Sequence, residues 1–289
     1  MSSVYWTREM KNRLSIVIGS GGVLCAASLG LSKALRREGL NPGMAVGCSG
    51  GSIYAATIAL GMDPTEAERL TLNLFTSDIF GGYTSNLKSA LSGETRFTES
   101  SSLIDDNIMF ERLKSVFGEK TFSDTVFPLY IVATELYKGE RVVVSSGKIL
   151  DAIRASIAIP LIFSPWKIGD QFLVDGAVCD PLPIDVAIQQ GSDVIAAVGF
   201  EMPTRKRMNS YTAMTTHFNS IYMNNILKST FAFYNAVHHA EIIPILPNFE
   251  KPVGTFDTAQ IPYIIEQGEK ATEEHIPYIK QLMADGTAR

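Results

Sequence analysis

The segment Gly47-Cys48-Ser49-Gly50-Gly51 carries the clearest chemical signal in the sequence. It matches the G-x-S-x-G pattern, in which a nucleophilic serine occupies a sharp turn between a strand and a helix. Small neighbours let the backbone pass closely through such a turn, and the hydroxyl then projects beside a helix N-terminus, which favours negative charge. The pattern predicts that Ser49 is a nucleophile, with Gly47 and Gly51 as supporting positions. A glycine-rich turn that packs or binds phosphate is the alternative.

A second glycine-rich turn, Gly-Ser-Gly-Gly, lies earlier in the chain at 19–22. It lacks the third glycine of a dinucleotide-binding fingerprint and the lysine of a P-loop, which argues against a nucleotide-binding protein. Its backbone amides have no bulky side chains around them and could hold an oxyanion. The expected oxyanion-hole residues are Ser20, Gly21, Gly22 and Gly50. A simple packing turn is the alternative.

A serine nucleophile needs a general base, and two arrangements are open. Asp175 ends a predicted strand, is followed by Gly176, and could accept the proton directly. An ordinary aspartate has a pKa of about 3.9, so we expect burial to raise the basicity of this carboxylate. A Ser-Asp-His triad is the alternative, because all the histidines follow Asp175: His217, His238, His239 and His275. Only two strands fit before Ser49, fewer than in a typical α/β-hydrolase, and this argues against the triad of that fold.

These segments, taken in order, make the chain similar to the patatin-like phospholipase family. The glycine loop, the elbow and Asp-Gly-Ala at 175–177 follow one another as in that family. Between them, 155–160 resembles the family's A-S-x-A-x-P segment, and Gly30 within the first helix and 181–185 also look like those of relatives. The resemblance extends over residues 14–200.

The resemblance implies a three-layer α/β/α fold with a mainly parallel sheet and a Ser49–Asp175 dyad that works without histidine. It also implies hydrolysis of lipid acyl esters of the phospholipase A or lysophospholipase type, with an acyl-enzyme intermediate. One departure concerns the glycine loop, where Leu24 and Cys25 replace a basic residue and a glycine of the family. A non-catalytic binding protein with the same fold is therefore a further alternative.

The elements that must position these residues follow from hydrophobic patterning. Short apolar strands alternate with helical patterns, which predicts a parallel sheet covered by helices. The expected strands are 14–18, 44–48, 128–134, 141–145, 171–174, 194–199 and 242–246. The expected helices are 23–38, 51–60, one opened by Asp63-Pro64, 149–157, 184–190, one after 204–210 that runs to about 239, and 260–283. No domain break is evident, so we expect a single domain over 1–289, with a core at 14–200 and a C-terminal helical extension at 204–289.

The segment Ser77–Asp106 has no clear pattern, and a loop of this length is usually a lid, a binding segment or disorder. Its apolar residues could line an acyl channel or touch a membrane, or they could be ordinary anchors of a loop. They are Ile79, Phe80, Tyr83, Leu87, Leu91 and Phe97.

The chain has 289 residues, of which 46% are apolar and 19% charged, enough to bury a large core. Its net charge of −5 argues against nucleic-acid binding. Cys25, Cys48 and Cys179 are too few and too scattered for a disulfide framework or a zinc site, which fits a reducing compartment. We expect no metal and no organic cofactor, and we interpret Cys48 as a packing residue.

The most hydrophobic stretch, Leu14–Leu35, follows three basic residues and so resembles a signal peptide or a membrane span. The glycines at its centre argue against an uninterrupted spanning helix. We expect a cytoplasmic protein that could touch a membrane peripherally, with a lipid or acyl-ester substrate. The oligomeric state stays open.

Overall fold

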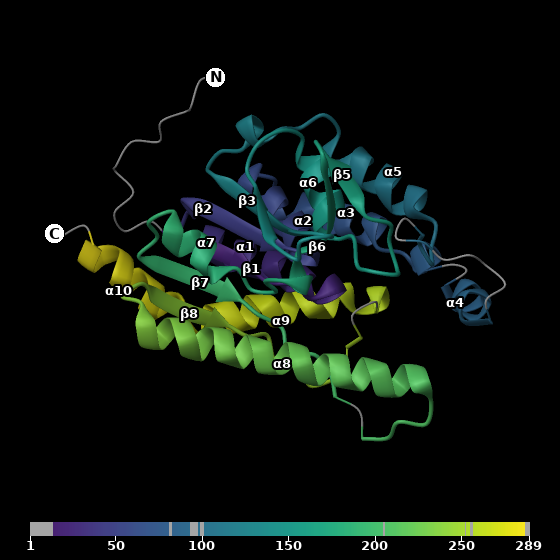
Figure 1. The fold of residues 1–289 in the computed structure, drawn as a ribbon. Helices are drawn as coiled ribbons and strands as arrows, with labels where there is room; N and C mark the ends of the chain where they lie inside the picture. The colour runs from purple at the N-terminus through teal and green to yellow at the C-terminus, as the bar shows by residue number, and fades with distance from the viewer. Residues whose placement is uncertain are drawn as a thin grey trace.

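The computed structural model describes residues 14–80, 83–92, 98, 101–204, 206–251, 253–254 and 257–286. The strands in these ranges form one sheet in the order β5-β6-β3-β2-β1-β7-β8, and β4 pairs with β3 off this path (Figure 1). The strands are β1 (Leu14–Ile18), β2 (Met44–Cys48), β3 (Leu129–Glu135), β4 (Arg141–Val144), β5 (Trp166–Ile168), β6 (Gln171–Asp175), β7 (Val194–Val198) and β8 (Glu241–Ile245). The predicted α/β class is confirmed.

The centre of the sheet is parallel, since β1 pairs in parallel with β2 and β7, β2 with β3, and β7 with β8. The pairs that involve β4, β5 and β6 are antiparallel. The carboxyl ends of parallel strands meet at one edge, which is where open α/β sheets place their ligands. Both glycine-rich turns follow parallel strands, β1 and β2, and therefore lie at this edge.

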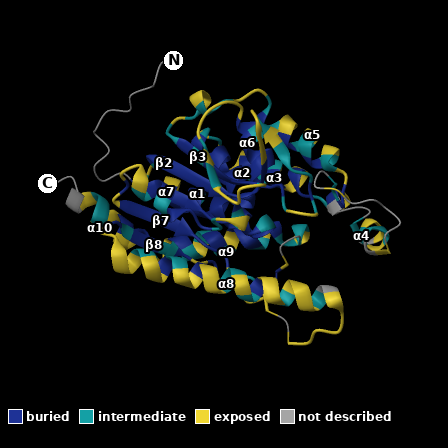
Figure 2. Ribbon diagram, in the orientation of Figure 1, coloured by how far each residue is buried: buried dark blue, intermediate teal, exposed yellow. Residues whose placement is uncertain are grey.

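Helices cover both faces of the sheet (Figures 1 and 2). They are α1 (Ala27–Arg37), α2 (Gly50–Ala59), α3 (Pro64–Leu74), α4 (Tyr83–Ser92), α5 (Asp106–Phe117), α6 (Ile149–Ser156), α7 (Ile184–Gln189), α8 (Tyr211–Val237), α9 (Ile261–Glu273) and α10 (Ile276–Gly286). The 3-10 helices are η1 (Gly22–Ala26), η2 (Ser77–Phe80), η3 (Phe122–Asp124), η4 (Gly176–Val178) and η5 (Thr258–Gln260).

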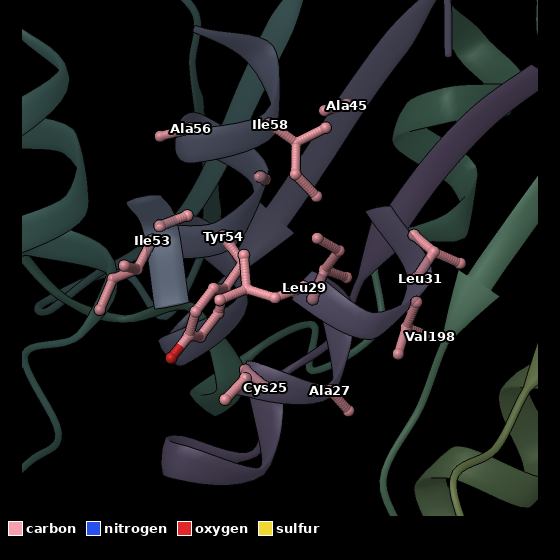
Figure 3. Packing of buried hydrophobic residues seen from close by; sticks show 14 of the residues in the cluster. Cys25, Ala27, Leu29, Leu31, Ala45, Ile53, Tyr54, Ala56, Ile58 and Val198 are labelled. Carbon is pink, nitrogen blue, oxygen red and sulfur yellow. The ribbon is translucent and has the colours of Figure 1, made fainter. Parts of the chain in front are cut away.

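The alternation of side chains along each strand divides the core into two layers. In β1, Ile16 and Ile18 belong to the cluster that includes α1, α2, α6 and α9, whereas Val17 belongs to the cluster under α7 and α8. Figure 3 shows the first layer, with Leu29 of α1 and Tyr54 of α2 among its side chains. The predicted three-layer arrangement follows from this two-sided burial.

The hydrophobic stretch Leu14–Leu35 is divided among β1, η1 and most of α1. The stretch is therefore part of the globular fold and not one helix. Within the described ranges, no helix has both the length and the apolar content needed to cross a membrane.

The segment Ser77–Asp106 contains more structure than the sequence predicts, because η2 and α4 lie within it and α5 begins at Asp106. Ile79 is buried, and Tyr83 packs against the main core cluster. The anchor interpretation therefore describes these two residues. Phe97 lies outside the described residues, as do the side chains of Phe80 and Leu91.

The C-terminal extension is not purely helical, because β8 joins the sheet beside β7. The single helix expected at 260–283 is two helices, α9 and α10, with Pro277 in the first turn of the second. Helix α9 packs against α1 so closely that a Cβ at Gly30 or at Gly268 would overlap the backbone of the other helix.

Candidate active site

Ser49 occupies the turn between β2 and α2, as the G-x-S-x-G pattern predicts. Its backbone angles, φ 54° and ψ −132°, lie in a region that residues with a side chain rarely adopt. Two side chains hold this strained backbone. The Ser49 amide donates to Ser156 Oγ at 2.9 Å, and Ser52 Oγ donates to the Ser49 carbonyl at 2.6 Å. Strain kept in place in this way is typical of functional positions.

The Ser49 hydroxyl donates a hydrogen bond of 2.6 Å to Asp175 Oδ2. Strand register explains how residues so distant in sequence meet. Cys48 of β2 pairs with Val132 of β3, and the next residue, Ala133, pairs with Asp175 of β6. Because β6 runs antiparallel to β3, its last residue arrives beside the elbow. Ser49 and Asp175 are 5% and 3% exposed, so the pair is nearly closed to water.

Burial raises the pKa of Asp175 from its ordinary value to about 6. Loss of hydration is the largest cause, and the hydrogen bonds from Ser49 and from the Ala177 amide act in the opposite direction. Both carboxylate oxygens are engaged, because Ala177 N donates to Oδ1 at 2.8 Å while Ser49 Oγ donates to Oδ2. The predicted increase in basicity is confirmed in direction.

The direct contact between Ser49 and Asp175 has no place for an imidazole between them, which is where a triad needs one. His238 follows the last residue of α8 as its C-cap, and its Nδ1 accepts from Ala240 N at 3.0 Å. It is exposed, as is His239. The expectation that these two histidines are capping or surface groups is confirmed.

The glycine loop is anchored by two backbone hydrogen bonds. Gly19 N donates to the Val198 carbonyl at 2.9 Å, and Ser20 N donates to the Pro181 carbonyl at 2.8 Å. The amide of Ser20 is thus not a free donor, which corrects its expected place in the oxyanion hole. Gly21 and Gly22 lie at the start of η1, where amides have no partner within a helix. These two amides remain as candidate donors.

Gly50 brings the elbow against the glycine loop. A Cβ at this position would lie 2.5 Å from the Gly22 carbonyl oxygen, so only glycine allows the two turns to approach this closely. Gly50 also opens α2, and its amide is a first-turn donor like those of η1. The other predicted support glycines, Gly47, Gly51 and Gly176, likewise lie where a Cβ would overlap backbone atoms.

Leu24 and Cys25, the departures from the family pattern, are buried in the core. The Cys25 thiol donates to the Gly19 carbonyl at 3.3 Å and thereby ties the loop to its own helix. Burial raises the pKa of the Cys25 and Cys48 thiols, and the nearby Asp175 charge adds to this effect, so both stay protonated. The apolar side chain of Leu24 thus occupies the place of the family's cation, and the Cys25 thiol that of its glycine.

Ser156 is a site residue that sequence reasoning did not single out. Its hydroxyl accepts from the Ser49 amide and donates to the Val132 carbonyl at 2.6 Å, and so links the elbow to β3. The segment 155–160 matched the family pattern as a whole, but nothing in its residue types showed which backbone group the hydroxyl would contact.

The chain belongs to the patatin-like phospholipase family, whose sequence model matches residues 16–188. That range begins within β1 and contains both glycine turns, Ser156 and Asp175.

The relatives found by sequence span a range of functional descriptions. An uncharacterized NTE family protein of Mycobacterium tuberculosis is 27% identical over 229 residues, 77% of this chain and 58% of the relative. The chain therefore spans less than two thirds of that relative's length. A probable lipid hydrolase of Invertebrate iridescent virus 6 is 27% identical over 226 residues, 73% of this chain and 72% of the viral protein.

Among solved structures, human GIVD cytosolic phospholipase A2 in complex with methyl gamma-linolenyl fluorophosphonate and terbium chloride superposes with a TM-score of 0.55. The sequences are 12% identical, and the match covers 97% of this chain and 60% of that one. This likeness shows a shared fold.

Proposed function

We propose that this protein is a lipid acyl-ester hydrolase in which Ser49 is the nucleophile and Asp175 the general base. The observation that carries the proposal is the 2.6 Å hydrogen bond between a strained serine and a buried carboxylate. Membership of the patatin-like phospholipase family and similarity to a probable lipid hydrolase support lipid esters as the substrate class.

In the first half-reaction, Ser49 Oγ attacks the ester carbonyl carbon while Asp175 Oδ2 takes the hydroxyl proton. The carbonyl oxygen becomes an oxyanion, which accepts hydrogen bonds from the amides of Gly21, Gly22 and Gly50. When the tetrahedral intermediate collapses, the carbon–oxygen bond to the alcohol breaks, and the proton on Asp175 goes to the departing alcohol. The acyl group is then an ester of Ser49.

In the second half-reaction, Asp175 takes a proton from water, whose oxygen attacks the acyl carbon. Collapse of the second oxyanion breaks the bond to Ser49 Oγ, which regains the proton from Asp175, and the carboxylic acid leaves. The raised pKa of Asp175 suits both halves, because a carboxylate with a pKa of about 6 is a stronger base than an ordinary one and is still mostly ionised at neutral pH.

The test is labelling with a fluorophosphonate probe, followed by identification of the modified peptide. We expect the label on Ser49, and we expect Ser49→Ala to lose roughly 10³-fold or more of its turnover of a short soluble ester and of dispersed phospholipid. Ser115→Ala, an exposed serine of α5, is the matched control and should keep full activity. An unlabelled wild-type protein without turnover would instead indicate a non-catalytic binding protein.

A further inference from the structure

Helix α8 is exposed along most of its length (Figure 2), and large apolar side chains are among its exposed residues, Val237 at its end included. Six of these, which we call the α8 stripe, are Tyr211, Met214, Phe218, Tyr222, Ile226 and Phe233. Their exposed fractions range from 41% to 78%. Contiguous apolar surface of this kind is uncommon on a protein without a binding partner.

The spacing of the stripe residues, three or four positions apart and then seven, places them on one side of the helix. The opposite side is the one that packs on the protein, where Leu227 and Phe231 are buried against the sheet and Ser220 is also buried. The stripe is therefore a second apolar face in addition to the one that the fold uses, and the core does not need it.

Helix α8 itself carries no carboxylate. From Met202 to Ala240 the sequence has no aspartate or glutamate, whereas the whole chain carries a net charge of −5. Lys206 and Arg207 are exposed just before the helix begins. Within α8, Lys228 forms an ion pair with Glu201 at 3.8 Å. An aromatic face without carboxylates, next to basic residues, is the composition of a helix that lies in the interface of an anionic membrane.

The same helix lies beside the glycine loop. On its inner side, Met223 and Leu227 line a small cavity together with Gly19 and Ser20 of the glycine loop. If a bilayer contacted the outer side of α8, only this helix would therefore separate it from the glycine loop, which in turn contacts the elbow at Gly50. This position suits an enzyme that takes its ester from a membrane.

We propose that the α8 stripe, together with Lys206 and Arg207, docks on the surface of an anionic lipid bilayer. This proposal rests on the proposed function for its biological purpose, since the bilayer is then the source of the lipid ester. A second copy of the chain fits less well, because α8 has no carboxylate that could face the basic residues of a partner helix.

The binding experiment uses the full chain with Ser49→Ala, so that vesicles stay intact. Flotation with phosphatidylcholine vesicles, with and without phosphatidylglycerol, measures the partition coefficient. We expect binding to the anionic vesicles and a loss of roughly tenfold or more in the partition coefficient when Phe218→Ser and Tyr222→Ser are combined.

The double variant Lys206→Gln and Arg207→Gln tests the basic residues. It should weaken binding to the anionic vesicles and leave binding to the phosphatidylcholine vesicles unchanged, and added salt should have the same effect. Val126→Ser, which changes an exposed apolar residue before β3, is the matched control and should bind normally.

Three results would overturn the proposal: a parent protein that ignores anionic vesicles, a stripe variant that binds as well as its parent, or a dimer in light scattering that the stripe variant abolishes. A soluble short-chain ester, hydrolysed by the chain with Ser49 intact, separates the two proposals. Normal hydrolysis without vesicle binding rejects only the docking surface. Stripe-dependent vesicle binding without hydrolysis rejects only the catalytic assignment.

Discussion

Burial of the Asp175 carboxylate has opposite effects on chemistry and on stability. Loss of hydration makes the group a better base, which the proposed proton transfer from Ser49 requires. The same loss of hydration makes the ionised form costly in the folded protein. Two measurements at the scale of this one residue follow from its pKa of about 6.

The first concerns the pH dependence of turnover. Since Asp175 must be ionised to accept a proton, we expect kcat/KM for a soluble ester to fall at acid pH with an apparent pKa of about 6. At one pH unit below that value the rate should be about a tenth of its plateau. A profile that stays flat down to pH 4.5 would rule out this carboxylate as the base.

The second concerns the pH dependence of stability. The folded pKa of Asp175 lies above the ordinary value of an aspartate, so its ionisation lowers the free energy of unfolding as pH rises through about 4 to 6. The full cost, about 3 kcal/mol, is present above pH 6 and absent below pH 4. Asp175→Asn removes this cost and loses about one hydrogen bond, so we expect a net gain of about 2 kcal/mol at pH 8.

Urea unfolding at pH 8 and at pH 4 measures the change, and the gain should disappear at the lower pH. Asp170→Asn, in the exposed turn between β5 and β6, should change stability at neither pH. A variant at position 175 that is less stable than wild type at pH 8 would show that the ionised carboxylate is a stabilising group.

At the scale of elements, α6 holds the elbow of the neighbouring strand through Ser156. Ser156→Ala leaves the Ser49 amide and the Val132 carbonyl without their partner. We expect a loss of about 1–3 kcal/mol in the free energy of unfolding. We also expect a roughly 10–100-fold lower kcat with little change in KM, because the nucleophile is displaced while the rest of the site is intact. Steady-state kinetics on a soluble ester would measure kcat and KM separately. An unchanged kcat would show that Ser156 is only a packing residue.

The glycine loop offers a second test at this scale. Leu24 is fully buried where the family carries a basic residue, so Leu24→Arg would place an unpaired guanidinium in the core. We expect a loss of about 3 kcal/mol or more. Thermal unfolding, with Leu24→Met as the conservative control, measures it. A variant with an unaltered melting temperature and higher activity would mean that this loop still accommodates the family's cation.

Sequence patterns predicted the elements around the site well, because β1, β2 and the first turn of α2 are short, apolar and bounded by glycines. They were less informative where tertiary contacts decide. The amide of Ser20 is lost as a donor because the Pro181 carbonyl, far along the chain, accepts it. Helix α5 begins with the Asp105 side chain capping the amide of Asn107, a local signal that the weak pattern of the surrounding segment obscures.

At the scale of the whole molecule, the region that matches the family is not structurally complete by itself. The match ends at residue 188, whereas β7 and β8 continue the sheet and α9 packs across α1. The predicted core at 14–200 also leaves out β8. An apolar strand such as 242–246 can be recognised in the sequence, but the sequence does not show that it pairs with β7. The packing of α9 on α1 can be tested directly.

Gly268→Ala would place a methyl group inside the backbone of Ala27, because the two helices touch there without side chains between them. We expect a loss of at least about 3 kcal/mol, since neither backbone can move away without disturbing the helix that follows the glycine loop. Chemical unfolding of the full chain measures it, with Glu266→Ala on the exposed side of α9 as the control. A Gly268→Ala protein as stable as wild type would show that the two helices can separate at little cost.

Helix α9 contacts η1 as well as α1, so a segment near the C-terminus supports the backbone that carries Gly21 and Gly22. A genetic screen that selects colonies unable to cleave esters should therefore recover substitutions in 261–273 alongside those at Ser49 and Asp175. Such distant mutants would keep Ser49 and Asp175 in contact. They would lose activity because the amides of Gly21 and Gly22 in the oxyanion hole had moved. A fusion protein that contains only the family-matched region 16–188 should show the same defect, whereas one that also includes α9 should not.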